Sequence, residues 1–345
     1  MKKDIKDFTL AQLETSLTGL GLPKYTARQV FSWVYQKGIE DFQAMSDIAK
    51  ASRMVLEENY FFSTPVLLQQ QLSQDGTYKF LWQLEDKATI ESALIPDGGR
   101  LTLCLSSQVG CKYHCIFCLS GRDGFKRNLK PAEIINQYLA VKKAVTGKIT
   151  NIVFMGTGEP LDNLDNVSAA IKILTDTKAV SFPKRKICIS TSGVIEGIER
   201  LAQLQLGTKI SLSLHAAKDE LRSRLMPVNK KYPLAKVMKA LGAYAGTQKL
   251  PVTFEYILIK GLNSTITDAQ NLAHLLKGID CKLNLIPCNA ALLGLKAPDA
   301  QEIEAFLKLI QDAGIFCTVR KSKGQDIAAA CGQLSAVWKK DAAAE

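Results

Sequence analysis

The stretch LTLCLSSQVGCKYHCIFC, residues 101–118, decides how the rest of the sequence is interpreted. Its first six residues form an apolar run that predicts a buried strand, and the loop that follows carries Cys111, Cys115 and Cys118. A structural zinc site uses four ligands, whereas no fourth cysteine lies nearby and His114 is wedged between two of the thiols. Cysteine-held iron-sulfur clusters normally use four thiolates, so three leave one iron with an open position. The spacing therefore indicates an iron-sulfur cluster that binds a small molecule.

Downstream of this loop, short apolar strands alternate with amphipathic helices. The expected strands cover residues 101–106, 149–155, 186–190, 209–214, 252–259 and 282–286, with residues 315–319 as a candidate seventh. The expected helices cover residues 132–145, 166–175, 234–245, 269–276 and 300–313. Strands rich in Val, Ile, Leu and Phe are typical of a parallel sheet covered by helices. Six such units predict an α/β fold, a partial (β/α)6 barrel over residues 99–340.

Two other segments precede the predicted barrel. Residues 1–62 carry apolar positions at helical spacing and are expected to form a small helical domain. Residues 63–98 change to an alternating, β-branched pattern with Asp75-Gly76 as a turn signal. We expect this second segment to be a β linker, a short antiparallel hairpin that bridges the helical domain and the barrel.

The composition narrows the classes of function. Apolar residues make up 47% of the 345 residues and charged residues 22%, which is typical of a globular protein. Lys plus Arg exceed Asp plus Glu by 44 to 33, and the resulting charge of +11 attracts polyanions. Nucleic acid is therefore the first partner to consider, and the alternative is a basic surface with no such partner.

The expected location is the cytoplasm, with no membrane association. The charged N-terminal residues are not followed by the apolar core of a secretory signal, and no stretch approaches the length needed to span a bilayer. Nine cysteines in a reducing compartment indicate metal binding, redox catalysis or core packing rather than a disulfide framework.

Polar residues recur just after the predicted strands, at the rim where parallel barrels place active sites. They are Gly158 and Glu159 after the second strand, Ser190 after the third, Ser213, Leu214 and His215 after the fourth, and Asn289 after the sixth. Each signal is weak alone, because a serine at a strand end is usually a cap and a lone histidine is usually a satisfied polar group. Their recurrence on successive strands favours a binding site on one rim.

The remaining cysteines differ in context. Cys188, Cys281 and Cys317 belong to apolar strands, where burial as small hydrophobic residues explains them. Cys331 follows the last strand in a stretch of small residues, where the thiol of a mobile loop can reach a substrate. Cys104 lies within the first strand, and its position alone indicates a core residue.

Four stretches together resemble the RlmN/Cfr family of radical S-adenosylmethionine (SAM) enzymes. They are TLCLSSQVGC at 102–111, GFKRNL at 124–129, MPVNK at 226–230 and ACGQL at 330–334, and the resemblance covers nearly the whole chain. It implies a [4Fe-4S] cluster on the three loop cysteines, whose open iron binds SAM, and it implies that the rim residues named above hold SAM. It also implies that the helical N-terminal segment is an accessory RNA-binding domain.

The resemblance further implies a reaction. Members of the RlmN branch methylate carbon 2 of adenine in 23S rRNA at the peptidyl-transferase centre and in tRNA next to the anticodon, with two SAM molecules per turnover. Cys331 matches the residue that becomes S-methylcysteine, Cys104 the thiol that resolves the RNA adduct through a transient disulfide, and Glu91 the proton acceptor. From the residues alone, Glu91 is a solvated charge on a strand.

The expected partners are RNA and an external electron donor of the flavodoxin or ferredoxin type, and the expected state is a monomer. Four basic clusters are candidates for RNA contacts: Lys126-Arg127, Lys184-Arg185-Lys186, Lys230-Lys231 and Arg320-Lys321 with Lys323. A run of charge is usually only a solvated face, so each cluster is a weak signal.

Two alternatives stay open at this point. The first is the Cfr branch, which modifies carbon 8 of the same ribosomal adenine. Val109, where Cfr-like sequences tend to carry cysteine, and the longer N-terminal segment favour the RlmN branch. The second is a non-enzymatic RNA-binding protein that uses the same cysteines to bind zinc.

Overall fold

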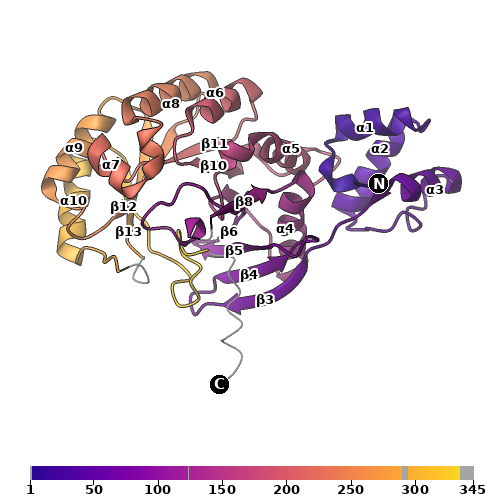
Figure 1. The fold of residues 1–345 in the computed structure, drawn as a ribbon, viewed down its shortest axis with the longest axis horizontal. Helices are drawn as coiled ribbons and strands as arrows, with labels where there is room; N and C mark the ends of the chain where they lie inside the picture. The colour runs from indigo at the N-terminus through magenta and orange to yellow at the C-terminus, as the bar shows by residue number, and fades with distance from the viewer. Residues whose placement is uncertain (1, 123, 290–293, 335–345) are drawn as a thin grey trace.

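The computed structural model describes residues 2–122, 124–289 and 294–334, and a ten-stranded sheet runs through it (Figure 1). Across the sheet the strand order is β14-β13-β12-β11-β10-β9-β6-β5-β4-β3. The strands are β3 (Val66–Leu72), β4 (Tyr78–Gln83), β5 (Thr89–Asp97), β6 (Arg100–Cys104), β9 (Asn151–Phe154), β10 (Ile187–Thr191), β11 (Lys209–Ser213), β12 (Val252–Leu258), β13 (Cys281–Pro287) and β14 (Cys317–Val319). From β6 to β14, each strand is parallel to its neighbour.

This parallel part is the predicted barrel, and the candidate seventh strand is present as β14. Helices cover its outer face (Figure 1). They are α4 (Pro131–Ala144), α5 (Leu164–Thr175), α6 (Ile195–Leu204), α7 (Asp219–Leu225), α8 (Leu234–Gln248), α9 (Ile266–Leu276) and α10 (Ala300–Asp312). The α/β partial barrel is therefore confirmed.

Two of these helices, α6 and α7, were not predicted. Gly197 lies inside α6, where a glycine usually weakens a helix. Here α6 passes so close to Leu161 that a Cβ on Gly197 would lie 2.6 Å from the leucine Cβ. The glycine permits close packing, which a sequence pattern cannot distinguish from a break.

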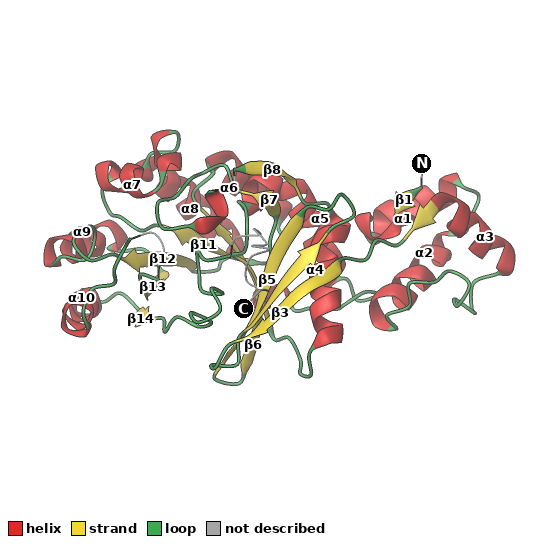
Figure 2. Ribbon diagram, turned by 60° about the horizontal axis from the view of Figure 1, so that its bottom comes forward, coloured by secondary structure: helices red, strands yellow, loops and turns green. Residues whose placement is uncertain are grey.

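The antiparallel segment was expected to be a hairpin that bridges two domains, and the structure gives it a different place. β3, β4 and β5 do form an antiparallel meander, but β5 also pairs with β6, with Ala93 opposite Cys104. The meander therefore extends the barrel sheet itself (Figure 2). This pairing matters for the site because it places side chains of β4 and β5 beside Cys104.

The N-terminal segment is helical, as expected, and lies at one end of the molecule (Figure 1). It contains α1 (Leu10–Gly19), α2 (Lys24–Phe31), a π-helical turn (Ser32–Gln36) and α3 (Lys50–Asn59), and β1 (Lys3–Asp4) pairs with β2 (Tyr60–Phe61). It is fixed against α4, where the Asp7 carboxylate accepts from the Ala132 amide at 3.0 Å and the Asn136 amide donates to the Ser63 carbonyl at 3.0 Å.

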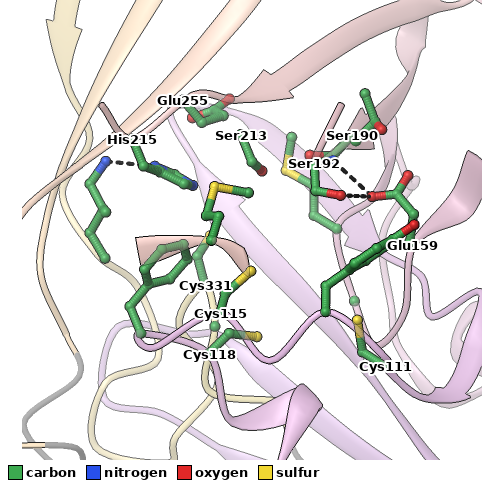
Figure 3. Close-up of a pocket in the computed structure, with 18 of the residues that line it drawn as sticks. Cys111, Cys115, Cys118, Glu159, Ser190, Ser192, Ser213, His215, Glu255 and Cys331 are labelled. Atoms are coloured by element: carbon green, nitrogen blue, oxygen red, sulfur yellow. Dashed lines mark hydrogen bonds between the residues drawn. The ribbon is translucent and has the colours of Figure 1, made fainter. Parts of the chain in front are cut away.

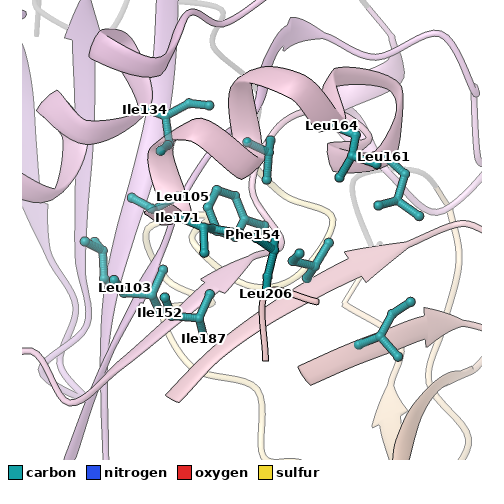
Figure 4. Packing of buried hydrophobic residues seen from close by; sticks show 14 of the residues in the cluster. Leu103, Leu105, Ile134, Ile152, Phe154, Leu161, Leu164, Ile171, Ile187 and Leu206 are labelled. Atoms are coloured by element: carbon teal, nitrogen blue, oxygen red, sulfur yellow. The ribbon is translucent and has the colours of Figure 1, made fainter. Parts of the chain in front are cut away.

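The barrel core lies between the sheet and its helices (Figure 4). Leu103, Ile152 and Ile187 occupy neighbouring strands and pack under Ile134 of α4 and Ile171 of α5, all almost completely buried. Each such side chain contributes about 1.5–3 kcal/mol on burial. No helix in the three described ranges is both long and apolar enough to cross a membrane.

A small two-stranded ladder closes the base of the cysteine loop. β7 (Gln108–Gly110) precedes the loop and β8 (Phe125–Asn128) follows it, and the two strands pair antiparallel. Gly110 has φ +75°, and a Cβ there would lie 1.8 Å from the Gly124 carbonyl oxygen. The close approach of the two strands therefore requires glycine at this position.

Candidate active site

A cavity opens at the carboxyl ends of the parallel strands (Figure 3). The cysteine loop, the turns that follow the strands and the loop after β14 all contribute to its wall. Of the site residues expected from the sequence, the cavity is lined by Cys111, Cys115, Cys118, Gly158, Glu159, Ser190, Ser213, His215, Asn289 and Cys331. Three others do not line it: Leu214, Cys104 and Glu91.

The three loop thiols face this cavity in their neutral form. Burial raises the pKa of Cys111 to about 12 and raises the pKa values of Cys115 and Cys118 as well. In the described part of the chain, no three His, Cys, Asp or Glu side chains are arranged to hold a metal ion. Cysteine binds metal as the thiolate, so these thiols would lose their protons when they hold a cluster. Three soft ligands on one loop, facing a cavity whose mainly apolar wall also carries polar groups such as Glu159 and Ser190, fit a [4Fe-4S] cluster with an open iron.

Glu159 supplies a buried carboxyl group at the wall of the cavity, on the same side as Cys111 (Figure 3). Its Oε2 accepts from the Ser192 amide at 2.7 Å and from the Ser192 hydroxyl at 2.8 Å, and its Oε1 accepts from the Leu161 amide at 3.1 Å. Burial raises the pKa of Glu159. These donors fix the position of the carboxyl group at the wall of the cavity. The sequence analysis missed Ser192, although it lies only two residues after Ser190.

Gly158 precedes this glutamate in a conformation with φ +104°. A Cβ on Gly158 would lie 2.5 Å from the Cβ of Gln108. The glycine therefore lets the turn after β9 approach β7, which brings the carboxylate of Glu159 close to the cysteine loop.

His215 is held as a neutral imidazole at the end of β11. Its Nδ1 accepts a hydrogen bond from the Ile257 amide at 2.9 Å, so Nε2 carries the hydrogen. The Phe117 ring packs edge-on against the imidazole, with 4.7 Å between the ring centroids. Burial, with a smaller contribution from the Arg222 cation, lowers the pKa of His215 to about 3. The side chain of the preceding Leu214 is completely buried, so any contact of Leu214 with SAM must come from its main chain.

Arg222 of α7 forms hydrogen bonds with the turns that follow the strands. This residue was not predicted from the sequence. Its side chain is fully buried. Its guanidinium donates to the carbonyl oxygens of Leu214, Ser192 and Ser213 at 3.0, 2.7 and 3.0 Å, and to Oδ1 of Asn229 at 2.7 Å. One cation therefore fixes the turns after β10 and β11 relative to each other.

We expect Arg222→Met to lower the free energy of unfolding by about 3 kcal/mol, because buried acceptors lose charged donors. Urea denaturation of the cluster-free protein measures this loss. Arg224→Met is the matched control, since Arg224 is exposed on the same helix. Equal stability of the two variants would show that the turns are held by other contacts.

The loop after β14 brings Cys331 to the cysteine loop. The Leu119 amide donates to the Gly332 carbonyl at 2.7 Å, and the Ser120 hydroxyl donates to the Leu334 carbonyl at 2.6 Å. Cys331 itself is exposed at the edge of the cavity, above Cys115 and Cys118 in Figure 3. Its thiol therefore lies between the cluster ligands and the open side of the cavity.

Cys104 lies behind this loop and is buried against Ala93 and Leu334. Burial raises the pKa of Cys104 to about 12; the nearby Cys331 also raises it, and Arg320 opposes these effects. Arg320 was expected in an RNA-binding cluster, but it lines the cavity and pairs with Oε2 of Glu255 at 3.6 Å. Cys104, Cys331 and the Arg320 cation therefore lie close enough to interact electrostatically.

Glu91 lies on β5, two residues before Ala93, and so on the same face of the sheet as Cys104. Its side chain is buried, whereas the sequence pattern alone indicated a solvated charge. Its Oε1 lies 3.4 Å from Nζ of Lys79 on β4.

The other basic clusters differ in their freedom to bind a polyanion. Arg127 pairs with both Asp86 and Glu133 at 2.7–2.8 Å, which occupies its guanidinium. Lys184, Arg185 and Lys186 are exposed in a 3-10 turn.

Comparisons with known proteins agree with this geometry. Residues 105–273 match the Radical SAM superfamily, and residues 3–61 match the Ribosomal RNA large subunit methyltransferase N-terminal domain. Two relatives are named Dual-specificity RNA methyltransferase RlmN. The protein from Nitratiruptor sp. is 42% identical over 96% of this chain and 97% of its own length, and that from Geobacter sulfurreducens is 43% identical over 96% and 91%.

A solved structure agrees over the same length. The crystal structure of a radical SAM methyltransferase from Sphaerobacter thermophilus has a TM-score of 0.90 and 38% sequence identity, and the match covers 97% of this chain and 100% of that one. Radical SAM enzymes use a [4Fe-4S] cluster and SAM, which are therefore the cofactors of this chain. Both family models match, the relatives and the solved structure match nearly the whole length, and the chain belongs to the RlmN family of radical SAM methyltransferases.

Proposed function

We propose that this enzyme methylates carbon 2 of adenine in RNA, in 23S rRNA at the peptidyl-transferase centre and in tRNA next to the anticodon. The observation that supports this most directly is that Cys331 lines the same cavity as the three loop cysteines, with Cys104 buried behind the loop that carries it. Carbon 2 of adenine is an sp2 carbon that does not behave as a nucleophile. A methyl group must therefore reach it by radical chemistry through a carrier, and an exposed thiol on a loop is suited to carry it.

When bound, the [4Fe-4S] cluster and two SAM molecules supply the methyl group and the radical. The cysteine loop holds the cluster through Cys111, Cys115 and Cys118. Gly158, Glu159, Ser190, Ser213, His215 and Asn289, with the main chain of Leu214, hold SAM. Cys331 carries the methyl group as S-methylcysteine at the edge of the cavity, where its exposed position allows it to meet both SAM and RNA.

Two further residues complete the reaction. After the methylene carbon on Cys331 has bonded to the ring, Glu91 accepts the proton from carbon 2, and the unpaired electron of the adduct would pass to the bound cluster. The Cys104 thiolate then attacks the sulfur of Cys331: the S–S bond forms, the C–S bond breaks, and the carbon that leaves takes a proton to complete the methyl group. Such a disulfide is transient and has to be reduced by an external thiol before the next turnover.

The proposed partners follow from the same scheme. The substrate is RNA, to which the exposed Lys184, Arg185 and Lys186 and the N-terminal helical domain offer contacts. A flavodoxin- or ferredoxin-like protein supplies electrons, and the enzyme acts as a cytoplasmic monomer.

Nucleoside mass spectrometry of RNA incubated with the enzyme tests this proposal, and 2-methyladenosine is the expected product. The competing assignment is the carbon 8 chemistry of the Cfr branch. Val109, a buried residue of β7, favours the carbon 2 branch because Cfr-like sequences tend to carry cysteine there. A product that contains 8-methyladenosine without 2-methyladenosine would overturn the proposal.

A further inference from the structure

Lys79 has no role in the proposed reaction, although it lies next to the proposed base. It lies on β4, and its side chain is only 13% exposed, while that of its partner Glu91 is 6% exposed. The ammonium nitrogen is 3.4 Å from Oε1 of Glu91 and 3.5 Å from the carbonyl oxygen of Ala328. Lys79 therefore contacts both the proposed base and the loop that carries Cys331.

The strand register puts these groups on one face of the sheet. Lys79 is opposite Ala93, and Ala93 is opposite Cys104, so their side chains share a face. Glu91 shares that face because it lies two residues from Ala93. The Cys331 loop covers it, since Leu334 packs on Ala93 and Cys104.

The charge of Lys79 matters because Glu91 is buried. A buried carboxyl group tends to bind a proton and become neutral, whereas an adjacent cation favours the ionised form. A general base has to be unprotonated when the substrate arrives. Cys104 shares this face, and Arg320, whose charge acts on Cys104 and Cys331, pairs with Glu255 at 3.6 Å.

We propose that Lys79 is a positioning residue of this enzyme, which keeps Glu91 ionised and joins it to the Cys331 loop. This inference rests on the proposed role of Glu91 in the methylation. In the step that it supports, the C–H bond at carbon 2 breaks, its electron pair stays in the ring, and an O–H bond forms on Glu91, while the unpaired electron of the radical adduct would pass to the bound cluster. Lys79 keeps its proton throughout and acts only through the carboxylate.

The first test needs no cofactor or substrate. The infrared difference spectrum between the cluster-free Lys79→Met protein and the unaltered protein at neutral pH should show the carbonyl band of an additional protonated, buried carboxylic acid. The band should disappear in the double variant with Glu91→Gln, which assigns it to this residue. Lys79→Arg should show no band, because it restores the charge. An unchanged spectrum in Lys79→Met would overturn the inference.

The second test follows single turnovers of the loaded enzyme with RNA. Lys79→Met should methylate Cys331 at the unaltered rate but form 2-methyladenosine at least about tenfold more slowly, since loss of a general base costs more than this. Lys79→Arg should recover most of the rate. Lys260→Met is the matched control, because Lys260 also forms an ion pair, with Asp299 and Glu302, but is half exposed and far along the sheet.

Two outcomes separate the competing explanations. A raised KM for RNA with an unchanged rate of turnover in Lys79→Met would make the lysine an RNA contact and overturn the positioning role. Absence of 2-methyladenosine from the unaltered enzyme would contradict the proposed function alone, because the infrared result does not depend on turnover.

Discussion

The Cys331→Ser variant is expected to retain its iron and to bind RNA, yet to form no methylated adenine. A serine hydroxyl is far less nucleophilic than a thiolate at neutral pH, so the variant lacks the methyl carrier. We expect the rate to fall by at least about a thousandfold, the scale on which loss of an essential nucleophile acts. Intact-protein mass spectrometry should find the added methyl group on the unaltered chain and not on the variant.

Cys281→Ser is the control for this experiment. Cys281, unlike Cys331, is buried; it lies at the start of β13 and does not line the cavity. The control should keep both its iron and its activity. Methylated RNA from Cys331→Ser at the unaltered rate would show that the methyl group travels without this thiol, and the carrier mechanism would be wrong.

The barrel was predictable because its signal is local. Each parallel strand corresponds to an apolar run in the sequence, and most of these runs are followed by apolar residues at helical spacing. All seven parallel strands were therefore predicted. The pairing of β5 with β6 was not found, because it joins the meander to the barrel through contacts that no local pattern encodes. The sequence pattern therefore predicted a hairpin between two domains, whereas in the structure β3, β4 and β5 belong to the main sheet.

In the site, too, features with a local sequence signal were predicted and features that depend on long-range contacts were not. Cysteine spacing and strand-end positions identified most residues that line the cavity. The positions of charged residues were harder to predict, because a charged residue is normally expected to be exposed to solvent. Arg222 is fully buried, Glu91 is buried beside Lys79, and Arg320 lines the cavity. Each is explained only by a partner from a distant part of the chain.

The second large effect is expected from Cys104→Ala, which should leave RNA covalently attached to Cys331. Cys104 is packed under the loop that carries Cys331, and without its thiolate the C–S bond of the adduct has no attacking group from β6. A protein–RNA conjugate should accumulate to about one per enzyme and survive denaturation, with its mass mapped to Cys331. Cys317→Ala, which removes a buried thiol from β14, should release methylated RNA normally.

The pH dependence of RNA release provides an independent check on the same thiol. Burial raises the pKa of Cys104 to about 12, so only a small fraction is thiolate at neutral pH, and this fraction rises as the pH rises. Decay of the adduct in the unaltered enzyme should therefore accelerate about tenfold per pH unit above neutrality. The conjugate of Cys104→Ala should show no such acceleration. Release of methylated RNA from Cys104→Ala with the pH dependence of the unaltered enzyme would mean that a different nucleophile breaks the C–S bond, and the burial of Cys104 beneath the loop would then be purely structural.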